Sequence, residues 1–226
     1  MAANLFKLAL TTALSLLLLS TLIAVYLLDQ LSVPVSKDSV FIIEPGSSLS
    51  TITKRLTRED LLPVNNIAFK AYAILTRDTG SIQAGQYQLK AGMPSQDVLA
   101  LFRSGKVIQH RITFPEGLRV QEWLERLQQA PYLESKTTGM TREDLRQFLG
   151  LATELEGSLF PDTYQYTLGD SDLVILELAV RKMKEVLGEE WSGRAMTVIS
   201  TPFDALVLAS MIEKETGYGP DREKIA

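Results

Sequence analysis

The sequence predicts an α+β fold that follows a single membrane-spanning helix at the N-terminus. Three observations lead to this prediction. An uncharged apolar run covers residues 8–28, short β-branched segments alternate with glycine turns between residues 40 and 114, and amphipathic helical patterns dominate from residue 119 onward. We therefore expect a membrane helix, an α+β module and a mostly helical C-terminal region, in that order.

The composition excludes several kinds of chemistry. The 226 residues include no cysteine and a single histidine, His110, which excludes disulfides, thiolate metal sites and multi-histidine metal sites. A net charge of −4, with 22% charged and 46% hydrophobic residues, argues against disorder and against a nucleic-acid-binding surface. We interpret His110, which stands in a strand pattern, as structural. Any chemistry must run on carboxylates, hydroxyls, Lys, Arg or the backbone.

Residues 8–28 form the predicted membrane helix. These 21 uncharged residues would span about 31 Å as a helix, close to the thickness of the hydrocarbon core of a bilayer. Lys7 precedes the run and Asp29 follows it, so the positive-inside rule places residues 1–7 in the cytoplasm and the bulk of the chain outside, in a single-pass protein of the cytoplasmic membrane. A cleaved signal peptide is the alternative, although its apolar region is usually shorter, about 7–15 residues.

The exported part divides into a tether and two regions. Residues 29–39 are polar with one proline, and we expect a short tether there. The module at 40–112 is expected to hold strands over 40–43 and 83–89, with helices beginning near Leu49, over 66–75 and from Ser95 to Gly105. A strand over 107–114 leads into the last region, where we expect helices at about 119–129, 141–150, 171–187 and 202–215, and another beginning at Asp221.

Two segments follow the same strand–turn–helix plan. Aligning Gly46 with Gly117 superposes Leu49 on Val120, Ile52 on Trp123 and Leu56 on Leu127. One interpretation is a single structural unit used twice. The alternative is that any junction of strand, glycine and amphipathic helix would match equally well.

Residues 200–216 contain the strongest candidate for a catalytic acid. Capping residues at 201–204 and an apolar run over 205–212 predict a helix that is buried on all sides. Glu213 continues the apolar row, whereas Glu215 points about 200° away around the helix. An apolar cleft would raise the pKa of Glu213 toward the range of a general acid. The alternative is a solvated helix tip.

A second candidate is the loop LEGSLFPDTY at residues 155–164. Aromatic rings, a proline, a glycine and two acids in ten residues are typical of a loop that lines a carbohydrate site. The composition leaves open an alternative, a core-packing turn with Phe160 and Tyr164 buried and Asp162 acting as a cap.

The chain resembles the endolytic murein transglycosylases, the YceG-like lytic transglycosylases of the bacterial cell envelope. Five segments carry the resemblance: the apolar N-terminus, the stretch at 40–105 with QAGQYQL, TFPEGLRVQEWLERL from Thr113, LEGSLFPDTY from Leu155, and LASMIEKETGYGPDREKIA from Leu208. The resemblance implies a LysM-like glycan-binding module at 40–112 and a catalytic domain at 113–226. That domain usually continues further in the family, so we expect an incomplete catalytic domain here.

The resemblance implies that Glu213, in the IEKET segment, is the catalytic acid. It makes four residues of the loop candidates for substrate binding, namely Glu156, Phe160, Asp162 and Tyr164. Glu215 is a further candidate for substrate binding. Ser158 departs from the aromatic residue often found in the family. The implied activity is endolytic cleavage between N-acetylmuramic acid and N-acetylglucosamine, which leaves 1,6-anhydromuramoyl ends and needs no metal or cofactor. The implied partners are glycan strands, the membrane and peptidoglycan synthases.

Two other functions stay open at this point. A non-catalytic, membrane-anchored scaffold would use only the glycan-binding module. A hydrolase would release reducing ends and would need a second acid, such as Asp162, at about 5–9 Å from Glu213.

Overall fold

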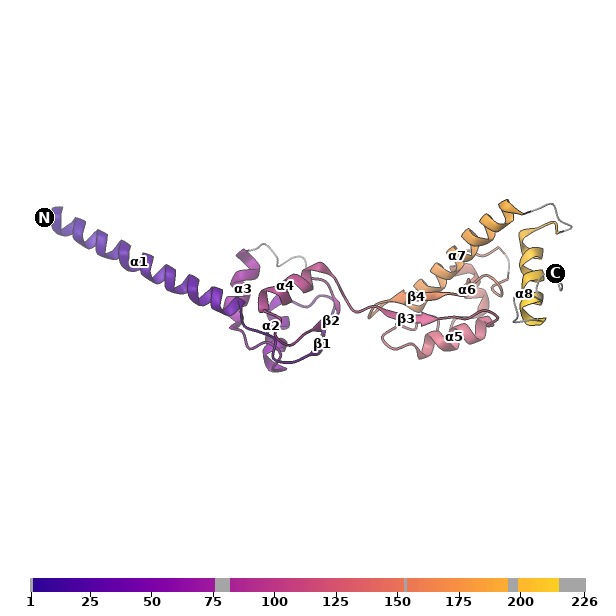
Figure 1. Ribbon diagram of the computed structural model, residues 1–226, viewed down its shortest axis with the longest axis horizontal. Helices are drawn as coiled ribbons and strands as arrows, with labels where there is room; N and C mark the ends of the chain where they lie inside the picture. The colour runs from indigo at the N-terminus through magenta and orange to yellow at the C-terminus, as the bar shows by residue number, and fades with distance from the viewer. Residues whose placement is uncertain (1, 76–81, 153, 195–198, 216–226) are drawn as a thin grey trace. The chain divides into compact units, whose positions relative to one another are not determined.

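The protein, described here by a computed structural model, divides into two compact units, Met1–Ile108 and Gln109–Ala226 (Figure 1). The structure describes residues 2–75, 82–152, 154–194 and 199–215. The predicted mixture of helices and strands is confirmed. The helix predicted from Asp221 lies outside the described residues.

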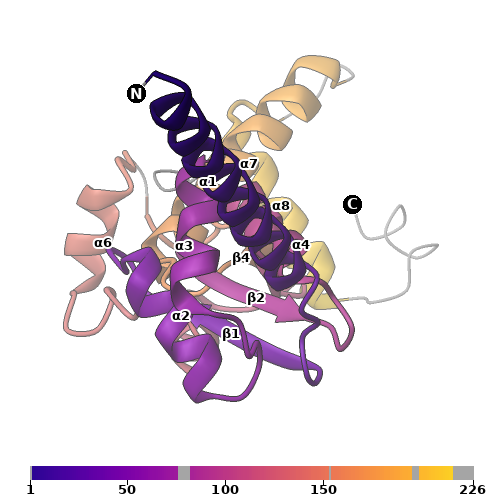
Figure 2. The same ribbon diagram turned by 90° about the vertical axis from the view of Figure 1, so that its left-hand side faces the viewer.

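The first unit is a two-stranded sheet packed by helices, joined to a long N-terminal helix. Its elements are α1 (Ala2–Leu31), β1 (Ser39–Ile43), α2 (Leu49–Arg58), α3 (Asn66–Leu75), β2 (Gly85–Leu89) and α4 (Ser95–Ser104). β1 and β2 pair antiparallel with Phe41 opposite Tyr87, and the views in Figures 1 and 2 show the two strands side by side. The ring of Phe102 packs on both of these aromatic residues, which closes the core.

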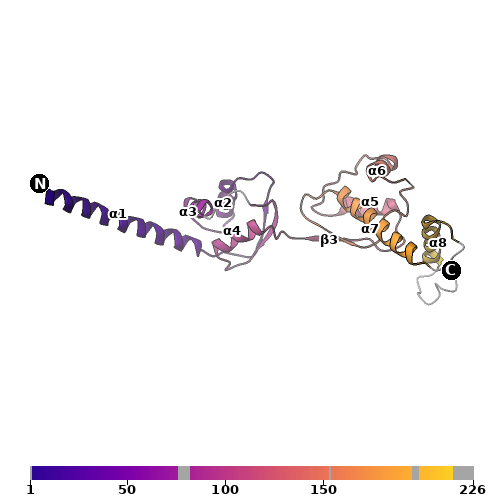
Figure 3. The same ribbon diagram turned by 90° about the horizontal axis from the view of Figure 1, so that it is seen from above.

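The second unit has a sheet of the same kind. Its elements are β3 (His110–Thr113), α5 (Val120–Gln129), α6 (Arg142–Phe148), β4 (Thr163–Tyr166), α7 (Asp172–Gly193) and α8 (Pro202–Glu215), several of which are visible from above in Figure 3. β3 and β4 pair antiparallel with Ile112 opposite Tyr164. The core contains Phe114 stacked on Trp123, with their ring centroids 3.7 Å apart.

β4 corrects the sequence prediction, which placed no strand between residues 150 and 171. The segment Thr163–Tyr166 alternates exposed and buried side chains, as a half-buried strand does. Glycine, proline and aspartate on both sides hid this short alternation. The partner strand β3 belongs wholly to the second unit, whereas the predicted boundary between residues 112 and 113 would cut through it.

The two units share one arrangement of elements. The segment from β1 to α4, which we name the first repeat, runs strand–helix–helix–strand–helix, and so does the segment from β3 to α7, the second repeat. The turns that begin α2 and α5 contain Gly46 and Gly117, which both have φ of +76°. The structure therefore supports the interpretation of one unit used twice, and extends it beyond the first helix.

Equivalent hydrogen bonds hold both repeats together. Arg55 Nη1 donates to the carbonyl of Ile42 at 2.9 Å, and Arg126 Nη1 donates to that of Thr113 at 3.3 Å. The hydroxyls of Tyr87 and Tyr164 each donate to a carbonyl four residues earlier in the chain.

In both repeats, the last helix accepts a backbone hydrogen bond from the segment that precedes the second strand. The N–H of Gln83 donates to the carbonyl of Phe102, and the N–H of Phe160 donates to that of Ala179, both at 3.2 Å. A chance match between two helix junctions would not reproduce such contacts between distant segments.

The N-terminal helix contains an apolar stretch, Ala9–Leu31, of the length and composition of a membrane-spanning helix. The residues after it, where the sequence predicts a short tether, are held against the first unit. Val35 is 2% exposed and exchanges backbone hydrogen bonds with Gly92 and Met93, while Leu31 is also buried. The few apolar side chains of this segment all point into the core.

The α8 helix begins as predicted but is not buried as predicted. The hydroxyl of Thr201 accepts from the N–H of Asp204 and donates to its carboxylate, which is the expected cap. Within the described part of the chain, however, no α8 side chain is buried, and Phe203, Val207 and Met211 are 44%, 42% and 60% exposed. A helix with apolar residues on all sides can be buried on any side, and tertiary packing decides which sides are buried.

Candidate active site

A groove of about 740 Å³ opens on the second unit. Three segments form its walls: the turn and helix start at 115–123, the loop at 154–161, and the inner side of α8 from Phe203 to Lys214. A smaller hollow of about 280 Å³ lies alongside and shares several lining residues with it, among them Glu156, Gly157 and Leu206. The groove is largely apolar with charged groups at several places, as carbohydrate and small-molecule sites commonly are.

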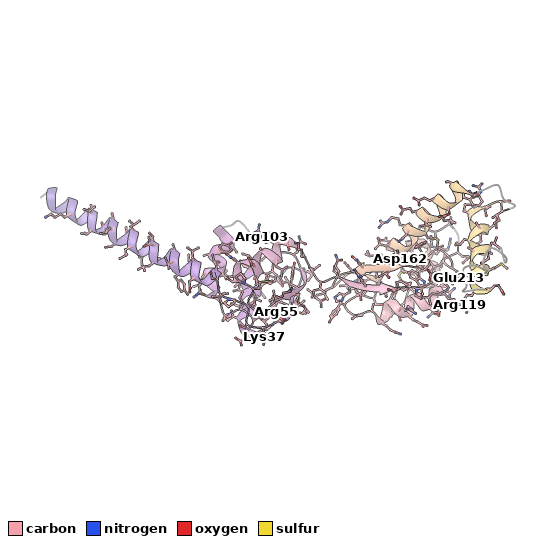
Figure 4. All side chains as sticks on the ribbon, in the orientation of Figure 1. Lys37, Arg55, Arg103, Arg119, Asp162 and Glu213 are labelled. Carbon is pink, nitrogen blue, oxygen red and sulfur yellow. The ribbon has the colours of Figure 1, made fainter. Side chains whose placement is uncertain are left out.

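Glu213 lies in this groove at the C-terminal end of α8. Its side chain is half-buried and lines the groove together with Ser210 and Leu206, which precede it by three and seven positions. Residues at such spacings share one helix face. Figure 4 labels Glu213 and, across the groove lining, Arg119 at the start of α5.

Two glycines allow α8 to approach the other walls. Gly157 has φ of +78°, and a Cβ added there would come within 3.3 Å of the Leu206 side chain. The carbonyl of Gly117 accepts a hydrogen bond of 3.2 Å from Lys214 Nζ, which neighbours Glu213 in sequence. These contacts position the helix end that carries Glu213.

Glu156 is the second predicted residue that the structure brings into the groove. One carboxylate oxygen accepts from the N–H of Val120, at 3.1 Å, and the other lies 4.0 Å from Arg142 Nη1. A carboxylate on the first N–H groups of a helix satisfies a donor that has no partner within the helix. Glu156 therefore caps α5 from a distant loop and holds two walls of the groove together.

Positive charge accompanies the acids in the groove. Arg119 and Arg142 line it together with Lys214, and they face Glu154, Glu156 and Glu213 from the same lining. Sequence analysis did not select the two arginines. Arg119 does belong to the TFPEGLRVQEWLERL segment of the family resemblance, so the signal was present there.

The structure places the other predicted residues of the 155–164 loop away from the groove lining. Tyr164 is buried against Phe114 and Trp123, and burial raises the pKa of its hydroxyl to about 12. Asp162 forms an ion pair with Lys182, which holds the pKa of this carboxyl below its ordinary value. Phe160 packs under the Lys182 ammonium, 5.2 Å from its ring centroid.

These three residues stay predicted substrate-binding candidates, although they lie outside the lining of the groove. The alternative, a core-packing turn, describes Phe160, Asp162 and Tyr164 better, since period-two alternation in β4 sends Tyr164 into the core. Glu215 is exposed and stands outside the groove lining, as its rotation from Glu213 predicted. Ser158 lines the smaller hollow, and its hydroxyl donates to the carbonyl of Glu154.

His110 occupies a structural position. Its ring lies between the rings of Tyr132 and Tyr166, at centroid distances of 4.8 and 5.5 Å, and it is absent from the groove lining. The described residues contain no cluster of three side chains suited to hold a metal ion.

Comparison with known proteins identifies the family. The model of the YceG-like family matches residues 41–226, which is most of the chain and includes every wall of the groove. The chain belongs to the YceG-like family.

One curated relative of this YceG-like protein is an endolytic murein transglycosylase of Bacillus subtilis (strain 168). The two sequences are 26% identical over 215 residues, which cover 85% of this chain and 59% of the relative. The chain thus spans about three-fifths of the length of that relative. A crystal structure of a YceG-like protein from Listeria monocytogenes is 22% identical, with a TM-score of 0.38 over 82% of this chain and 67% of the other.

Proposed function

We propose that this YceG-like protein is a membrane-anchored lytic transglycosylase that cuts glycan strands of peptidoglycan between N-acetylmuramic acid and N-acetylglucosamine. The observation that carries the proposal is that Glu213 lies in the groove. The family match and the curated relative, an endolytic murein transglycosylase, support the choice of activity. The groove has a volume of about 740 Å³ and opens at the surface, and we infer from this that cleavage occurs within a strand.

Glu213 acts as both acid and base in this proposal. Its protonated carboxyl donates to the oxygen that bridges the two sugars, and the N-acetylglucosamine side leaves with that proton. The C6 hydroxyl of the muramoyl residue then attacks C1, and the Glu213 carboxylate accepts the hydroxyl proton. The product is a 1,6-anhydromuramoyl end, no water is consumed, and Glu213 returns to its protonated state.

Glu213 and Glu156, the two predicted acids of the groove, do not share a role in this proposal. Glu156 has a different part, because the Val120 N–H and Arg142 already engage its oxygens. We assign it to holding the groove walls and Arg119 to contacting the substrate.

The decisive experiment compares Glu213→Gln with Glu190→Gln, a control on an exposed acid of α7 outside the groove. Full chains in lipid nanodiscs are incubated with glycan strands, and the products are weighed by mass spectrometry. We expect anhydro ends from the wild type and the control, and a loss of about a hundredfold to ten-thousandfold in Glu213→Gln. Undiminished anhydro product from Glu213→Gln would show that another group is the acid.

The same products distinguish a hydrolase from a lyase. Hydrolysis adds one water to the product, whereas the intramolecular route does not. The structure gives the hydrolase little support, because Asp162, the second acid that the sequence suggested, is paired with Lys182 outside the groove lining.

Glycan binding without cleavage is a second candidate, favoured by one observation. Among the described residues α8 has no buried side chain, so the helix that carries Glu213 is held from one side only. Sedimentation with murein sacculi tests this function: a wild-type chain that binds sacculi and forms no new ends would support it. Contact with peptidoglycan synthases stays a prediction of the resemblance.

The first unit has its own place in the proposal, as a LysM-like glycan-binding module. Its support is the shared arrangement of the two repeats, since the second repeat uses the equivalent turn as a groove wall. Amide hydrogen exchange of the full chain tests it. Protection around residues 44–49 on addition of glycan fragments is expected, and unchanged exchange there would contradict the assignment.

A further inference from the structure

Helix α3 exposes two large apolar side chains on one face. Ile67 is 77% exposed and Ile74 is 63% exposed, and seven positions apart on a helix they lie in one row. Lys70, half-buried, stands between them in the same row. We name these three residues the α3 stripe. Single exposed isoleucines are common on protein surfaces, so the location of the stripe decides what it means.

The stripe lies on a helix fixed to the end of the apolar N-terminal helix. α3 packs directly against α1, and the α1 side chain of Gln30 accepts a hydrogen bond of 2.8 Å from the N–H of Asn65, which immediately precedes α3. The backbone carbonyl of Gln30 accepts a second, from the hydroxyl of Ser95 on α4, also at 2.8 Å. Figures 1 and 2 both show α3 beside the C-terminal end of α1.

This attachment sets the depth of α3 relative to a bilayer. The apolar stretch of α1 ends at Leu31, and its first charged residue is Asp29. About 20 residues of helix cross the hydrocarbon core, so with α1 in a bilayer its last turns lie at the interface with the headgroups. A helix packed on those turns must lie in the same layer.

The chemistry of the stripe suits that layer. Interfacial helices insert apolar side chains about 5–10 Å into the boundary between headgroups and acyl chains. The long stem of Lys70 can lie along the apolar surface while its ammonium reaches lipid phosphates. The first unit also carries nine Lys and Arg against six Asp and Glu between residues 32 and 108, which favours an anionic surface.

We propose that α3 lies on the bilayer surface, with Ile67 and Ile74 inserted among the lipids, and holds the first unit at a fixed orientation on the membrane. The inference rests on the membrane anchoring by α1 that is part of the proposed function, and is independent of the catalytic assignment. In this proposal the first unit is attached to the membrane at two points, α1 and α3.

The absence of cysteine from the sequence provides a direct test. Single cysteines are introduced as Ile67→Cys and Ile74→Cys in the full chain, labelled with an environment-sensitive fluorophore and reconstituted in nanodiscs of phosphatidylethanolamine and phosphatidylglycerol. Lipids with a quencher near the headgroup, or deep in the acyl chain, report the depth of each label.

Two matched variants serve as references, since both replace exposed apolar residues. Leu17→Cys in α1 tests the anchor, and Val40→Cys on β1 tests an exposed site of the first unit outside α3. Leu17 is 61% exposed and Val40 is 49% exposed. We expect strong shallow quenching at 67 and 74, deep quenching at 17, and little quenching at 40.

Each alternative outcome is distinct. Labels at 67 and 74 that behave like the label at 40, while the label at 17 is quenched, would overturn the proposal and leave the anchor intact. A label at 17 without quenching would overturn the anchor and the proposal together. A blue-shifted emission at 67 and 74 without lipid quenching would place a protein surface there instead of lipid, and would also overturn the proposal.

Discussion

The first and second repeats have the same order of elements, yet only the second forms the groove with Glu213. Both contain the glycine turn, the arginine that donates to a strand carbonyl, and the tyrosine whose hydroxyl reaches back four residues. The second repeat is followed by α8, which packs beside its turn and loop. The comparison teaches that the shared fold supplies a scaffold, and that the candidate site arises from an added helix and from Glu156.

The largest stability difference between the repeats is expected at the start of their last helices. Asp172 begins α7 fully buried, and its carboxylate accepts hydrogen bonds from Lys136, Thr137 and Ser135. Ser95 begins α4, and its hydroxyl donates a single bond, to the carbonyl of Gln30. Asp172→Ala should cost about 2–4 kcal/mol, since it leaves several buried donors unsatisfied.

The control for this prediction is Ser95→Ala, which should cost about 1 kcal/mol because a single hydrogen bond is lost. Both tryptophans, Trp123 and Trp191, lie in the second unit, so urea unfolding followed by tryptophan fluorescence reports Asp172→Ala. Amide exchange of the first unit reports Ser95→Ala. Equal costs would mean that the buried carboxylate has no special part in the second repeat.

A second prediction tests whether α8 is what separates the repeats. Gly157→Ala and Gly92→Ala, the second in the first repeat, both place a side chain at positive φ, but only the first directs a Cβ at α8, while the second meets open space. Each should lose about 1 kcal/mol of stability from backbone strain. Gly157→Ala should additionally lower the rate of anhydro-end formation about tenfold, through displacement of Glu213.

The activity assay with glycan strands measures this difference. A Gly92→Ala chain that loses as much activity as Gly157→Ala would contradict the view that contact with α8 distinguishes the second repeat.

The tyrosine pair offers a matched comparison, because burial raises the pKa of both hydroxyls. Tyr87→Phe and Tyr164→Phe should each cost about 1 kcal/mol, because each loses a buried hydrogen bond. The pKa of Tyr164 is raised from 10.0 to about 12 by burial, so the folded state disfavours the phenolate. The stability it contributes is complete below pH 10 and is lost as the pH rises toward 12.

Unfolding of the second unit between pH 9 and 12, followed by tryptophan fluorescence, checks this prediction. The wild type should lose stability over the upper part of that range, and Tyr164→Phe should lose less. If the wild type and Tyr164→Phe lost stability equally between pH 9 and 12, burial would not raise the pKa of Tyr164 in the folded state.

The smallest effect is expected at the Asp162–Lys182 pair, which has no counterpart among the ion pairs described in the first repeat. Both side chains are partly exposed, so Lys182→Met should cost only about 0.5 kcal/mol at pH 7. Lys182 lowers the pKa of Asp162 from its ordinary 3.8, so the contribution is present above that pH and disappears as the carboxyl protonates in stronger acid.

Chemical unfolding at pH 7 and at pH 3 tests the pair, with Lys184→Met, an exposed lysine on the same helix, as the control. A cost for Lys182→Met that is unchanged at low pH would indicate lost packing on Phe160 instead of a lost charge pair.

Local patterns were enough to predict most elements. The apolar run of α1, the periodicity of α5 and α7 and the cap of α8 all depend on neighbours within one or two turns. The bounds of α5 and α8 match the prediction within one residue, whereas α1 and α7 each extend up to six residues beyond it. The strand β4 was not predicted because four residues among turn-forming neighbours show too little alternation of apolar and polar side chains. Its pairing with β3 also joins segments about fifty residues apart in the chain.

The candidate site was predictable only in part. Glu213 followed from its place at the end of an apolar helix row, which is local information. Arg119, Arg142 and the capping role of Glu156 depend on a loop meeting the start of a distant helix, which no spacing in the sequence encodes. The same holds for Tyr164, whose burial followed from the strand that the sequence did not predict.

The sequence by itself determined the membrane-length helix, the order of helices and strands, the exclusion of thiol and multi-histidine chemistry, and the choice of Glu213 over Glu215. These depend on composition and on side-chain direction along single elements. Tertiary structure decided that residues 29–39 are fixed in the first unit, that α8 stays largely uncovered in the described chain, and that Glu156 caps α5. Burial and capping across segments depend on which surfaces meet, and that is a property of the whole fold.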